Sequence, residues 1–359
     1  MKIQNIVFVC NYAADYAGNF IEGLKQLHRM LKSREITCNY LLPIDAENKE
    51  WVKDLEKEVK VVFCDFSPRT LFSTLKKTLK HNTLIHTHFI GARETFAVRK
   101  AGKHFNSVII YNMHNRYGEN DNCIRKIIKR IIYHNVFFIG VSKAVYDDLC
   151  CVFDKKKCYC VPNAISLDRL SNANYFRNDS NIIKLLILGT HFIRKGTDLA
   201  IEAVSNIQST KKIELEIIAH DIEQTQNRIK KILGFIPDNI SVILPVENIK
   251  EVYEKTDIFL APARSEAFGY AVVEALYCGC EVIASDIPGQ NTMKDIVGIR
   301  WIQSENVEEL QKAITEEINS KYDISKKEKQ RTYIEENYSL SAWCRKILQV
   351  YEMVCSSQI

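Results

Sequence analysis

The chain has 359 residues, 46% of them hydrophobic and 26% charged, which is ordinary for a globular protein. This length exceeds the size at which one hydrophobic core stops growing, so we expect two domains of roughly 150 to 180 residues each. The 49 basic and 44 acidic residues leave a net charge of only +5, and so small an excess gives no argument for binding nucleic acid.

The amino-terminal stretch MKIQNIVFVCNYAADYAG predicts a first β-strand, because it lacks the h-region and the cleavage site of a signal peptide. No uninterrupted apolar stretch of about 18 residues occurs, so we expect no membrane span. The twelve cysteines lie mostly within apolar runs, which favours reduced core thiols in a cytosolic protein. We predict no metal site at 158–160, since no second Cys or His pair follows at zinc spacing.

Strand-like and helix-like patterns alternate through the first half of the chain. Helical patterns such as GNFIEGLKQLHRMLKS separate short β-branched or aromatic runs, which are NIVFVC, TCNYLL, VKVVFC, TLIHTH, SVIIYN, VFFIGVS and KCYCVPN. This alternation predicts a parallel sheet with helices on both faces. The polar residues 166–181, rich in Asn and Ser, form the predicted linker between the domains.

The alternation restarts after the linker with the runs IKLLILG, ELEIIAH, SVILP, DIFLAPA, EVIASD and GIRWI. The sequence therefore predicts an α/β protein with two doubly wound, Rossmann-like parallel sheets. Such sheets bind ligands at the carboxyl ends of their strands, so we expect a site in a cleft where the two sheets face each other. The last segment, SLSAWCRKILQVYEMV, has the apolar spacing of an amphipathic helix that could pack on either domain.

The turn after the first strand, CNYAADYAGNF, lacks the G-x-G-x-x-G pattern of dinucleotide-binding proteins. This argues against a dinucleotide-dependent oxidoreductase, because the pyrophosphate turn needs those glycines. Gly18, which opens the first predicted helix, could let a backbone N–H approach a phosphate or a sugar. The alternative is that Gly18 is only a turn residue.

The stretch LGTHFIRKGTDLAIEA places Arg194 and Lys195 directly before Gly196 and a predicted helix. Two cations beside a helix amino terminus suit a diphosphate, because the helix dipole and the unpaired N–H groups also favour an anion. The alternative is a solvated basic loop, and both interpretations stay open here.

The stretch RSEAFGYAVVEALYCGCEVIASDIPG carries two glutamates around a helix start. Glu266 follows a predicted strand, and Glu274 falls in the second turn of the helix that starts at Gly269. The two carboxylates can then lie on the order of 10 Å apart, far enough to hold different parts of one elongated ligand. Carboxylates accept hydrogen bonds from sugar hydroxyls, and the N–H groups of Phe268, Gly269 and Tyr270 suit a sugar oxygen or a phosphate.

These motifs resemble those of one large family. EAFGYAVVE looks like the E-x7-E motif of the retaining GT-B glycosyltransferases, the glycosyl transferases group 1 family. RKGTDLAIEA is similar to the family's phosphate-binding segment, VPNAI to its Pro-Asn-Gly segment and IGVSKA to its strand-Ser element. The matches run in order from about residue 5 to the terminal helix. The resemblance implies an acceptor-side domain at 1–165, with helix 338–359 packing back on it, and a donor-binding domain at 182–337.

The resemblance also implies roles for individual residues. Glu266 would bind the hydroxyls of the donor sugar and Glu274 the ribose, while Arg194 and Lys195 would hold the diphosphate. His114 would contact the transferred sugar.

Gly18, Thr190, Phe268, Gly269 and Tyr270 complete the predicted donor-binding residues. Three positions depart from the family pattern: Ala164 stands where glycine is usual, Thr190 where arginine is frequent, and Gln290 where a second glycine is common. The change at position 190 makes Arg194 the preferred phosphate partner.

No D-x-D pair occurs in the chain. Glycosyltransferases of the other major fold use such a pair to hold a divalent ion on the diphosphate. We therefore expect a metal-independent enzyme. The resemblance implies a front-face mechanism, in which the leaving diphosphate helps to deprotonate the acceptor.

A basic amphipathic pattern lies at NCIRKIIKRIIYHN. Arg125, Lys126, Lys129 and Arg130 share one face of the predicted helix, and the opposite face carries Ile124, Ile127, Ile128, Ile131 and Ile132. We expect the isoleucines to be buried in their own domain rather than inserted in a bilayer. The basic face could meet anionic lipid headgroups in either case.

Together these features predict a retaining hexosyl- or N-acetylhexosaminyltransferase that acts on a glycan or lipid-linked acceptor. We expect a UDP-sugar as the substrate, no cofactor, and a role in cell-envelope or capsular polysaccharide synthesis. The protein would be cytoplasmic, at the inner face of the membrane. The alternatives are a sugar-nucleotide epimerase of the same architecture and a non-catalytic paralogue that binds sugar nucleotides.

Overall fold

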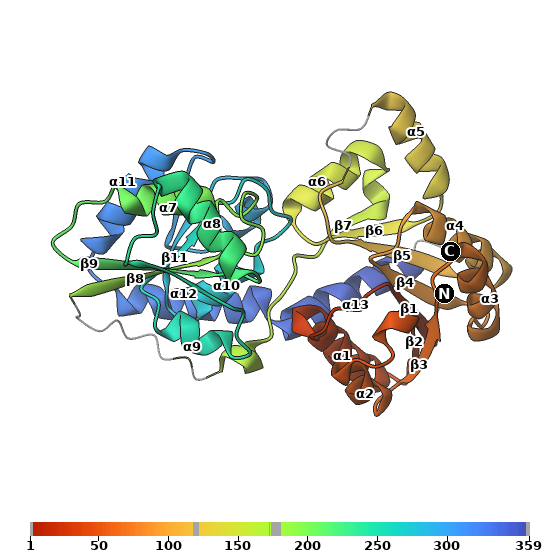
Figure 1. Ribbon diagram of the computed structural model, residues 1–359. Helices are drawn as coiled ribbons and strands as arrows, with labels where there is room; N and C mark the ends of the chain where they lie inside the picture. The colour runs from red at the N-terminus through yellow and green to blue at the C-terminus, as the bar shows by residue number, and fades with distance from the viewer. Residues whose placement is uncertain (1–2, 118–121, 172, 174–180, 357–359) are drawn as a thin grey trace. The chain divides into compact units, whose positions relative to one another are not determined.

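The computed structural model describes residues 3–117, 122–171, 173 and 181–356. The chain divides into two compact units. Unit 1 comprises Met1–Ala164 and Leu340–Ile359, and unit 2 comprises Ile165–Ser339. Figure 1 shows a strand-and-helix body for each unit.

Unit 1 contains a seven-stranded parallel sheet in the order β3-β2-β1-β4-β5-β6-β7. Its strands are β1 (Asn5–Cys10), β2 (Thr37–Pro43), β3 (Lys60–Cys64), β4 (Thr83–His88), β5 (Val108–Met113), β6 (Phe137–Gly140) and β7 (Cys158–Cys160). Its helices are α1 (Gly18–Lys32), η1 (Ile44–Ala46), α2 (Glu50–Glu56), α3 (Pro68–Thr78), α4 (Ala92–His104), α5 (Cys123–Ile132), α6 (Lys143–Val152), η2 (Lys155–Lys157) and α13 (Leu340–Ser356).

Unit 2 contains a six-stranded parallel sheet in the order β10-β9-β8-β11-β12-β13. Its strands are β8 (Ile182–Leu188), β9 (Lys212–Ile218), β10 (Ile240–Ile243), β11 (Ile258–Ala261), β12 (Glu281–Ser285) and β13 (Ile299–Ile302). Its helices are η3 (Leu167–Leu170), α7 (Thr197–Ser205), α8 (Ile222–Leu233), α9 (Ile249–Glu254), α10 (Tyr270–Tyr277), η4 (Gln290–Met293), α11 (Val307–Ile318) and α12 (Ile324–Tyr338).

Both sheets are buried on two faces, which confirms the predicted α/β class with two Rossmann-like parallel sheets. In unit 2, α7, α8 and α11 contribute to the core on one face, and α10 and α12 contribute to the core on the other. In unit 1, Ile6 and Phe8 of β1 pack in a core with α1, α2 and α13, while Val7 and Val9 are buried outside that core. Burial on both faces explains why these strands are almost continuously apolar.

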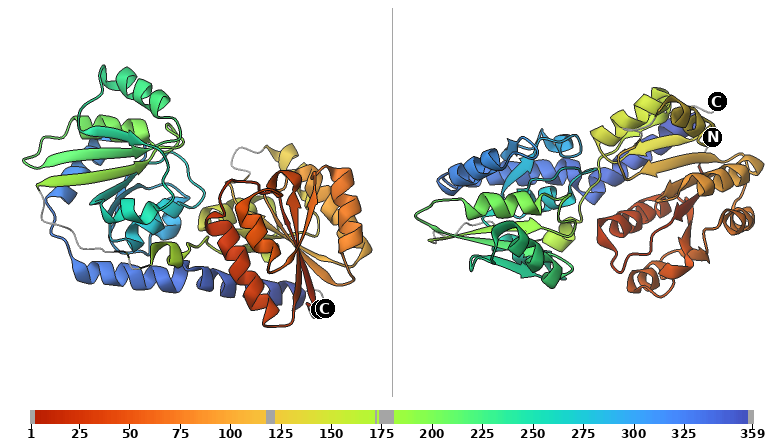
Figure 2. Two further views of the ribbon diagram at one scale, coloured as in Figure 1. Left: turned by 60° about the horizontal axis from the view of Figure 1, so that its bottom comes forward. Right: turned by 45° about the horizontal axis from the view of Figure 1, so that its top comes forward.

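The terminal helix α13 packs on unit 1. The helix lies beside α1 (Figure 2). Leu340, Trp343 and Cys344 lie in the core of the unit. A Cβ at Gly23 of α1 would lie 3.5 Å from both Leu340 and Trp343, so the two helices pack closely there.

The predicted linker 166–181 is described only in part, because residues 172 and 174–180 lie outside the described residues. Its first turn, η3, belongs to unit 2, and Leu170 is buried in the core of that unit. Unit 2 therefore begins at Ile165, before the predicted start of the second domain at residue 182.

Helix α5 corrects one expectation about unit 1. The sequence predicts that the isoleucines of α5 are buried in the domain, but Ile124, Ile127, Ile128 and Ile131 are exposed and Ile132 is half-buried. The helix contacts the unit through Arg130, whose Nε donates to the carbonyl of Val152 at 2.6 Å.

The cysteines follow the prediction in most places. All twelve are free thiols, and eight of them are buried. Cys123, Cys151 and Cys160 are exposed and Cys150 is half-buried, so for these four the predicted burial is wrong.

Candidate functional site

The predicted donor residues of unit 2 lie in two loops that follow neighbouring strands. Strands β8 and β11 pair directly, so the loop 189–196 after β8 and the loop 262–269 after β11 leave the same edge of the sheet. Gly196, whose φ is 71°, lies so close to the second loop that a Cβ there would overlap the carbonyl of Pro262. Only glycine combines that approach with that left-handed backbone.

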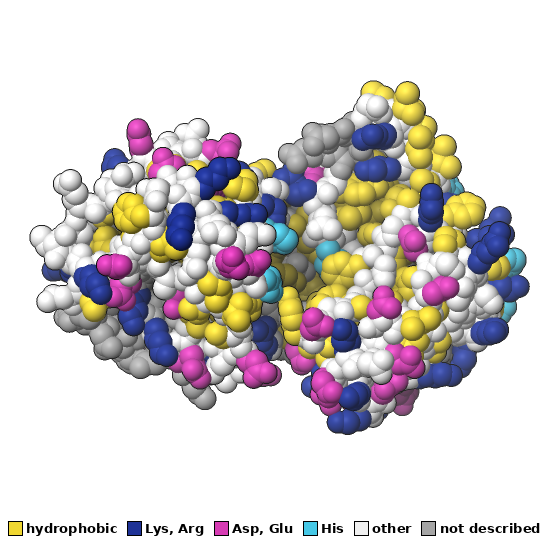
Figure 3. Space-filling model, in the orientation of Figure 1, with side chains coloured by type: hydrophobic (Ala, Val, Ile, Leu, Met, Phe, Trp, Pro, Cys, Tyr) yellow, Lys and Arg dark blue, Asp and Glu magenta, His cyan; other side chains and the backbone are white. Residues whose placement is uncertain are grey.

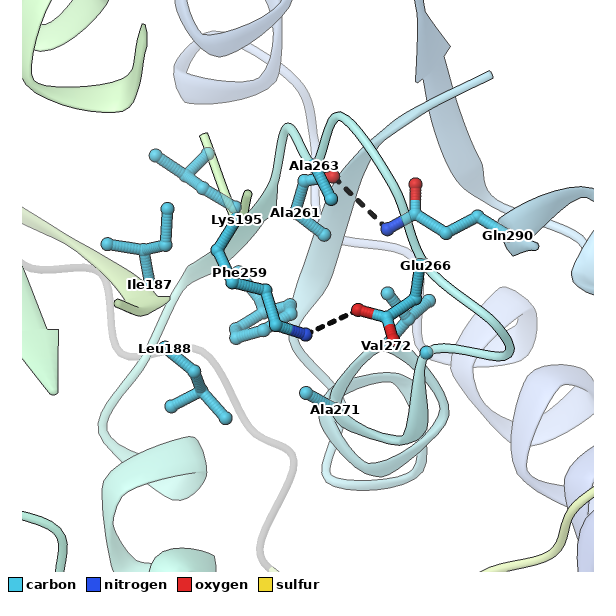
Figure 4. A pocket seen from close by; sticks show the side chains of 12 residues that line it. Ile187, Leu188, Lys195, Phe259, Ala261, Ala263, Glu266, Ala271, Val272 and Gln290 are labelled. Carbon is cyan, nitrogen blue, oxygen red and sulfur yellow. Dashed lines mark hydrogen bonds and ion pairs between the residues drawn. The ribbon is translucent and has the colours of Figure 1, made fainter. Parts of the chain in front are cut away.

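Glu266 lies at the centre of this edge (Figure 4). Its Oε2 is 2.5 Å from Lys195 Nζ and 3.4 Å from Arg194 Nη1, and its side chain is only 14% exposed. Arg194 also donates to the carbonyl of Ser265 at 3.2 Å. The structure therefore brings together the carboxylate and both cations predicted for the diphosphate, and it pairs them with one another.

A pocket surrounds this ion pair. Its polar lining includes Lys195, Glu266 and Gln290, and its walls are largely apolar, with Ile187, Leu188, Phe259, Ala261, Ala263, Ala271 and Val272. Gln290 is buried and its Nε2 donates to the carbonyl of Ala261 at 3.2 Å, but its Oε1 has no partner among the described residues. In the sequence Gln290 is only a departure from the family pattern, and no signal there marks it as a pocket residue.

The backbone beside Glu266 is fixed by a second close approach. A Cβ at Gly289 would overlap the carbonyl of Glu266. The loop after β12 therefore rests directly on the backbone that carries the carboxylate.

Glu274 lies in the second turn of α10, as predicted. It is only 8% exposed, and Tyr253 donates to its Oε2 at 3.3 Å. Burial, followed by the charge of Glu274, raises the pKa of Tyr253 well above its usual range, so the phenol stays a donor. Arg169 Nη1 lies 4.0 Å from Glu274 Oε1. Neither Tyr253 nor Arg169 carried a signal in the sequence.

The other predicted donor residues of unit 2 have different surroundings. Thr190 is exposed in the turn after β8. Phe268 is buried in the core, with its ring 5.2 Å from that of Tyr270, so only its backbone can face a ligand. Helix α10 begins at Tyr270, directly after Gly269, and the N–H groups of its first turn have no acceptor within the helix.

His114 and Gly18 belong to unit 1. His114 directly follows β5, and its ring stacks on that of Phe89 with centroids 3.9 Å apart. Gly18 opens α1, and the ring of Phe20, two residues later, lies 5.6 Å from the ring of His114. The unit thus brings these two predicted residues to one edge of its sheet.

A chain of buried side chains leads away from His114. His114 Nε2 lies 3.1 Å from His88 Nδ1 and 3.2 Å from Asn112 Nδ2. His86 Nδ1 lies 2.7 Å from the hydroxyl of Tyr351 on α13. Loss of hydration lowers the pKa of His86 and of His114 to about 3, and lowers that of His88 well below its usual range. All three rings are therefore neutral near pH 7.

Arg264 ties the two loops of the pocket together. Its guanidinium makes two 2.8 Å bonds to the carboxylate of Asp198, in the first turn of α7, and donates to the carbonyl of Ile193 at 2.5 Å. Its Nε lies 2.8 Å from Glu305. The hydrogen bonds that Arg264 donates to Asp198 raise the pKa of Arg264 above its usual range. Arg264 was not predicted as a site residue, since no motif marks it.

Comparison with known proteins agrees with this geometry. Residues 171–339, which lie within unit 2, match the model of the family Glycosyl transferases group 1. An uncharacterized 41.2 kDa protein in the cps region of Klebsiella pneumoniae is 27% identical over 240 residues. That alignment covers 61% of this chain and 64% of the relative, so the chain spans less than two thirds of that protein.

Solved structures show the same fold. The crystal structure of a glycosyltransferase from Rickettsia africae has a TM-score of 0.81 at 20% identity, over 99% of both chains. Anabaena HepE, solved in complex with UDP, has a TM-score of 0.77 at 14% identity, over 97% of this chain and 99% of that one. At these identities the likeness establishes the GT-B fold.

We predict that Arg264→Met loosens both loops of the pocket. The loss of its charged bonds should lower the free energy of unfolding by about 1.5–3 kcal/mol and accelerate amide hydrogen exchange in 190–198 and 263–268. The matched control is Arg300→Met, which removes ion pairs to Glu316 and Glu317 instead. Equal exchange in the pocket loops of both variants, measured by mass spectrometry, would show that Arg264 only stabilises the unit.

We also predict that acid destabilises unit 1 through His86, His88 and His114. The folded-state pKa values of His86, His88 and His114 lie below the unfolded value of about 6.5, so the unfolded chain binds more protons and stability is lost as pH falls below 6.5. Each ring should lower the free energy of unfolding by up to about 1.4 kcal/mol for each unit by which the pH falls. Urea unfolding, followed by tryptophan fluorescence at pH 7.5, 6.5 and 5.5, measures the free energy of unfolding. This free energy should fall less between pH 7.5 and 5.5 for His114→Gln than for the control His104→Gln. Identical pH dependence in these two variants would contradict the prediction.

Proposed function

We propose that the protein is a retaining glycosyltransferase, which moves a sugar from a nucleoside-diphosphate sugar to an acceptor hydroxyl. The observation that carries the proposal is the meeting of Lys195 and Arg194 with Glu266 in one pocket at the carboxyl edge of the sheet. Cations for a diphosphate and a carboxylate for sugar hydroxyls are the groups that such a donor requires. The group 1 match of residues 171–339 supports the same assignment.

The donor would exchange the partners of the ion pair. Lys195 Nζ and Arg194 now face Glu266. A diphosphate offers these cations more negative charge than one carboxylate does, so Lys195 and Arg194 turn to the phosphates when the donor binds. The oxygens of Glu266 then become available to the hydroxyls of the sugar, and the apolar walls of the pocket keep water away from the bond that breaks.

Glu274 would accept hydrogen bonds from the ribose hydroxyls. Its low exposure favours this role, because a buried carboxylate strongly favours a ligand that brings donors. Tyr253 holds one of its oxygens and fixes the carboxylate plane. The N–H groups at the start of α10 would meet a phosphate or a sugar oxygen.

His114 would act as a neutral partner of the transferred sugar. With its pKa lowered to about 3, the ring is neutral near pH 7. It can then donate or accept a hydrogen bond, but it cannot act as a general acid. We therefore assign deprotonation of the acceptor to the leaving diphosphate, in a front-face reaction with retention. Gly18 and Thr190 would complete the donor contacts through their backbones.

We further propose a UDP-sugar as the donor, a hexosyl or N-acetylhexosaminyl group as the cargo, and a glycan or lipid-linked acceptor of the cell envelope or capsule. The relative in a cps region supports the acceptor class, and the UDP complex of a similar fold supports the nucleotide. The enzyme would work in the cytoplasm at the inner face of the membrane, with α5 near anionic lipid. Incubation with a panel of nucleotide sugars, with and without acceptor, separates transfer from epimerisation and from simple binding.

We predict that Glu266→Gln and Glu274→Gln fail differently. Glu274→Gln should weaken the binding of free UDP and of the donor alike, by about 1.5–3 kcal/mol, the typical contribution of a hydrogen bond to a charged group. Glu266→Gln should not weaken UDP binding, since UDP carries no sugar for this carboxylate and its phosphates no longer compete with Glu266 for Lys195. The same variant should lower turnover. Calorimetry with UDP and initial rates with the donor measure the two effects. Equal losses of UDP affinity, or full activity of Glu266→Gln, would contradict this division.

We predict that the enzyme still transfers sugar to a soluble acceptor after treatment with EDTA. Arg194, Lys195 and a helix amino terminus would neutralise the leaving diphosphate, so no divalent ion is required. The test compares initial rates before and after chelation, with magnesium and manganese added back. An absolute requirement for either ion would overturn the metal-independent mechanism.

A further inference from the structure

Helix α5 of unit 1 presents an apolar stripe to solvent. Ile124, Ile127, Ile128 and Ile131 are 68%, 54%, 49% and 67% exposed. Their spacing places them on one side of the helix, and we call these four residues the isoleucine ridge. In Figure 3 hydrophobic side chains form the outer border of the α5 region, with Lys and Arg side chains inward of them.

Polar contacts hold the ridge outward. At the start of α5, Asn122 caps the helix by accepting from the N–H of Arg125 at 2.9 Å. At its end, Arg99 of α4 donates to the carbonyls of Ile131 and Ile132 at 2.9 and 2.5 Å.

Two of the basic residues of α5 contact the unit. Lys129 Nζ lies 3.8 Å from the ring centroid of Tyr117, and Arg130 donates to the carbonyl of Val152. The helix therefore cannot roll to bury its isoleucines without losing these contacts. Four exposed isoleucines in one stripe are unfavourable in water, and such a stripe indicates a surface that another apolar phase covers.

The surroundings of the ridge are cationic. Residues 122–135 include no Asp or Glu. Arg125 is exposed beside the ridge and Lys126 is half-buried. On α4, which packs against α5, Phe96 is 60% exposed, and Arg93 and Lys100 on the same helix face are also exposed.

We propose that the isoleucine ridge inserts at the headgroup boundary of an anionic lipid bilayer, with α5 lying in the membrane plane. Apolar side chains would enter the acyl region while Arg93, Lys100 and Arg125 meet lipid phosphates, as in interfacial amphipathic helices. Within the described residues, no helix is both long and apolar enough to cross a membrane. A second copy of the chain is a less suitable partner for the ridge. Pairing of two ridges would bring the basic residues of both helices together, and 122–135 has no acidic residue to balance them.

This inference deepens the proposed function, because it names how the enzyme would reach a lipid-linked acceptor. It also reverses the sequence-based expectation, in which the basic face of α5 made the contact. If the isoleucines insert, binding of the protein to vesicles should persist at high salt. Binding through the basic side chains alone would be lost at high ionic strength.

The test compares three forms of the full chain. In the ridge variant Ile124, Ile127 and Ile131 become Ser. The matched control changes three exposed apolar residues of unit 2, Val297, Ile232 and Ile324, to Ser. Cosedimentation with phosphatidylglycerol vesicles at 0.1 and 0.5 M salt should give wild-type binding for the control and at least about tenfold weaker binding for the ridge variant. Melting temperatures confirm that all forms are folded.

A reporter variant, Ile128→Trp, tests insertion directly. Its added fluorescence should shift to the blue on vesicles and be quenched by lipids brominated on the acyl chain. Equal vesicle binding by the ridge variant and the control, or no quenching by brominated lipid, would overturn the proposal. A wild-type dimer that the ridge variant loses in sedimentation equilibrium without lipid would assign the ridge to a second copy instead. None of these measurements uses a donor, so their failure is separate from failure of sugar transfer on a soluble acceptor.

Discussion

A carboxylate with only 14% of its side chain exposed needs a partner, and Glu266 takes Lys195 at 2.5 Å. Because Lys195 follows β8 and Glu266 follows β11, this ion pair also joins two loops of the pocket. The same two groups are the ones that a sugar diphosphate would separate, one to the phosphates and one to the sugar. Each charge thus has a partner in the pocket, and the proposed donor would replace that partner.

The loops keep this geometry through contacts that lie outside the pocket. Arg264 joins the first turn of α7 to the loop of Glu266 through Asp198. Gly196 and Gly289 allow three backbone segments to touch, at positions where any Cβ would overlap a carbonyl. The loops that carry Lys195 and Glu266 are thus held in place by backbone contacts and by the bidentate pair of Arg264 with Asp198.

The sequence predicts which residues lie at the carboxyl edge of the sheet in unit 2. It does not predict the side-chain pairs that form between separate elements there. Alternating apolar runs indicate where β8 and β11 end, and therefore where Lys195 and Glu266 lie. The pairing of Tyr253 with Glu274, and of Arg264 with Asp198, depends on side chains from separate elements, for which no spacing rule exists. Helix α5 shows a different limit. Periodicity predicts which residues share a face, but the contacts of Arg99 and Arg130 decide which face turns toward the unit.

The most direct measurement of the central claim is a crystal structure with an intact UDP-sugar bound. The account predicts that Lys195 Nζ leaves Glu266 and lies within hydrogen-bond distance of a diphosphate oxygen, while Glu266 accepts hydrogen bonds from the hydroxyls of the sugar. A complex in which Lys195 stays on Glu266 and the diphosphate binds elsewhere would contradict it.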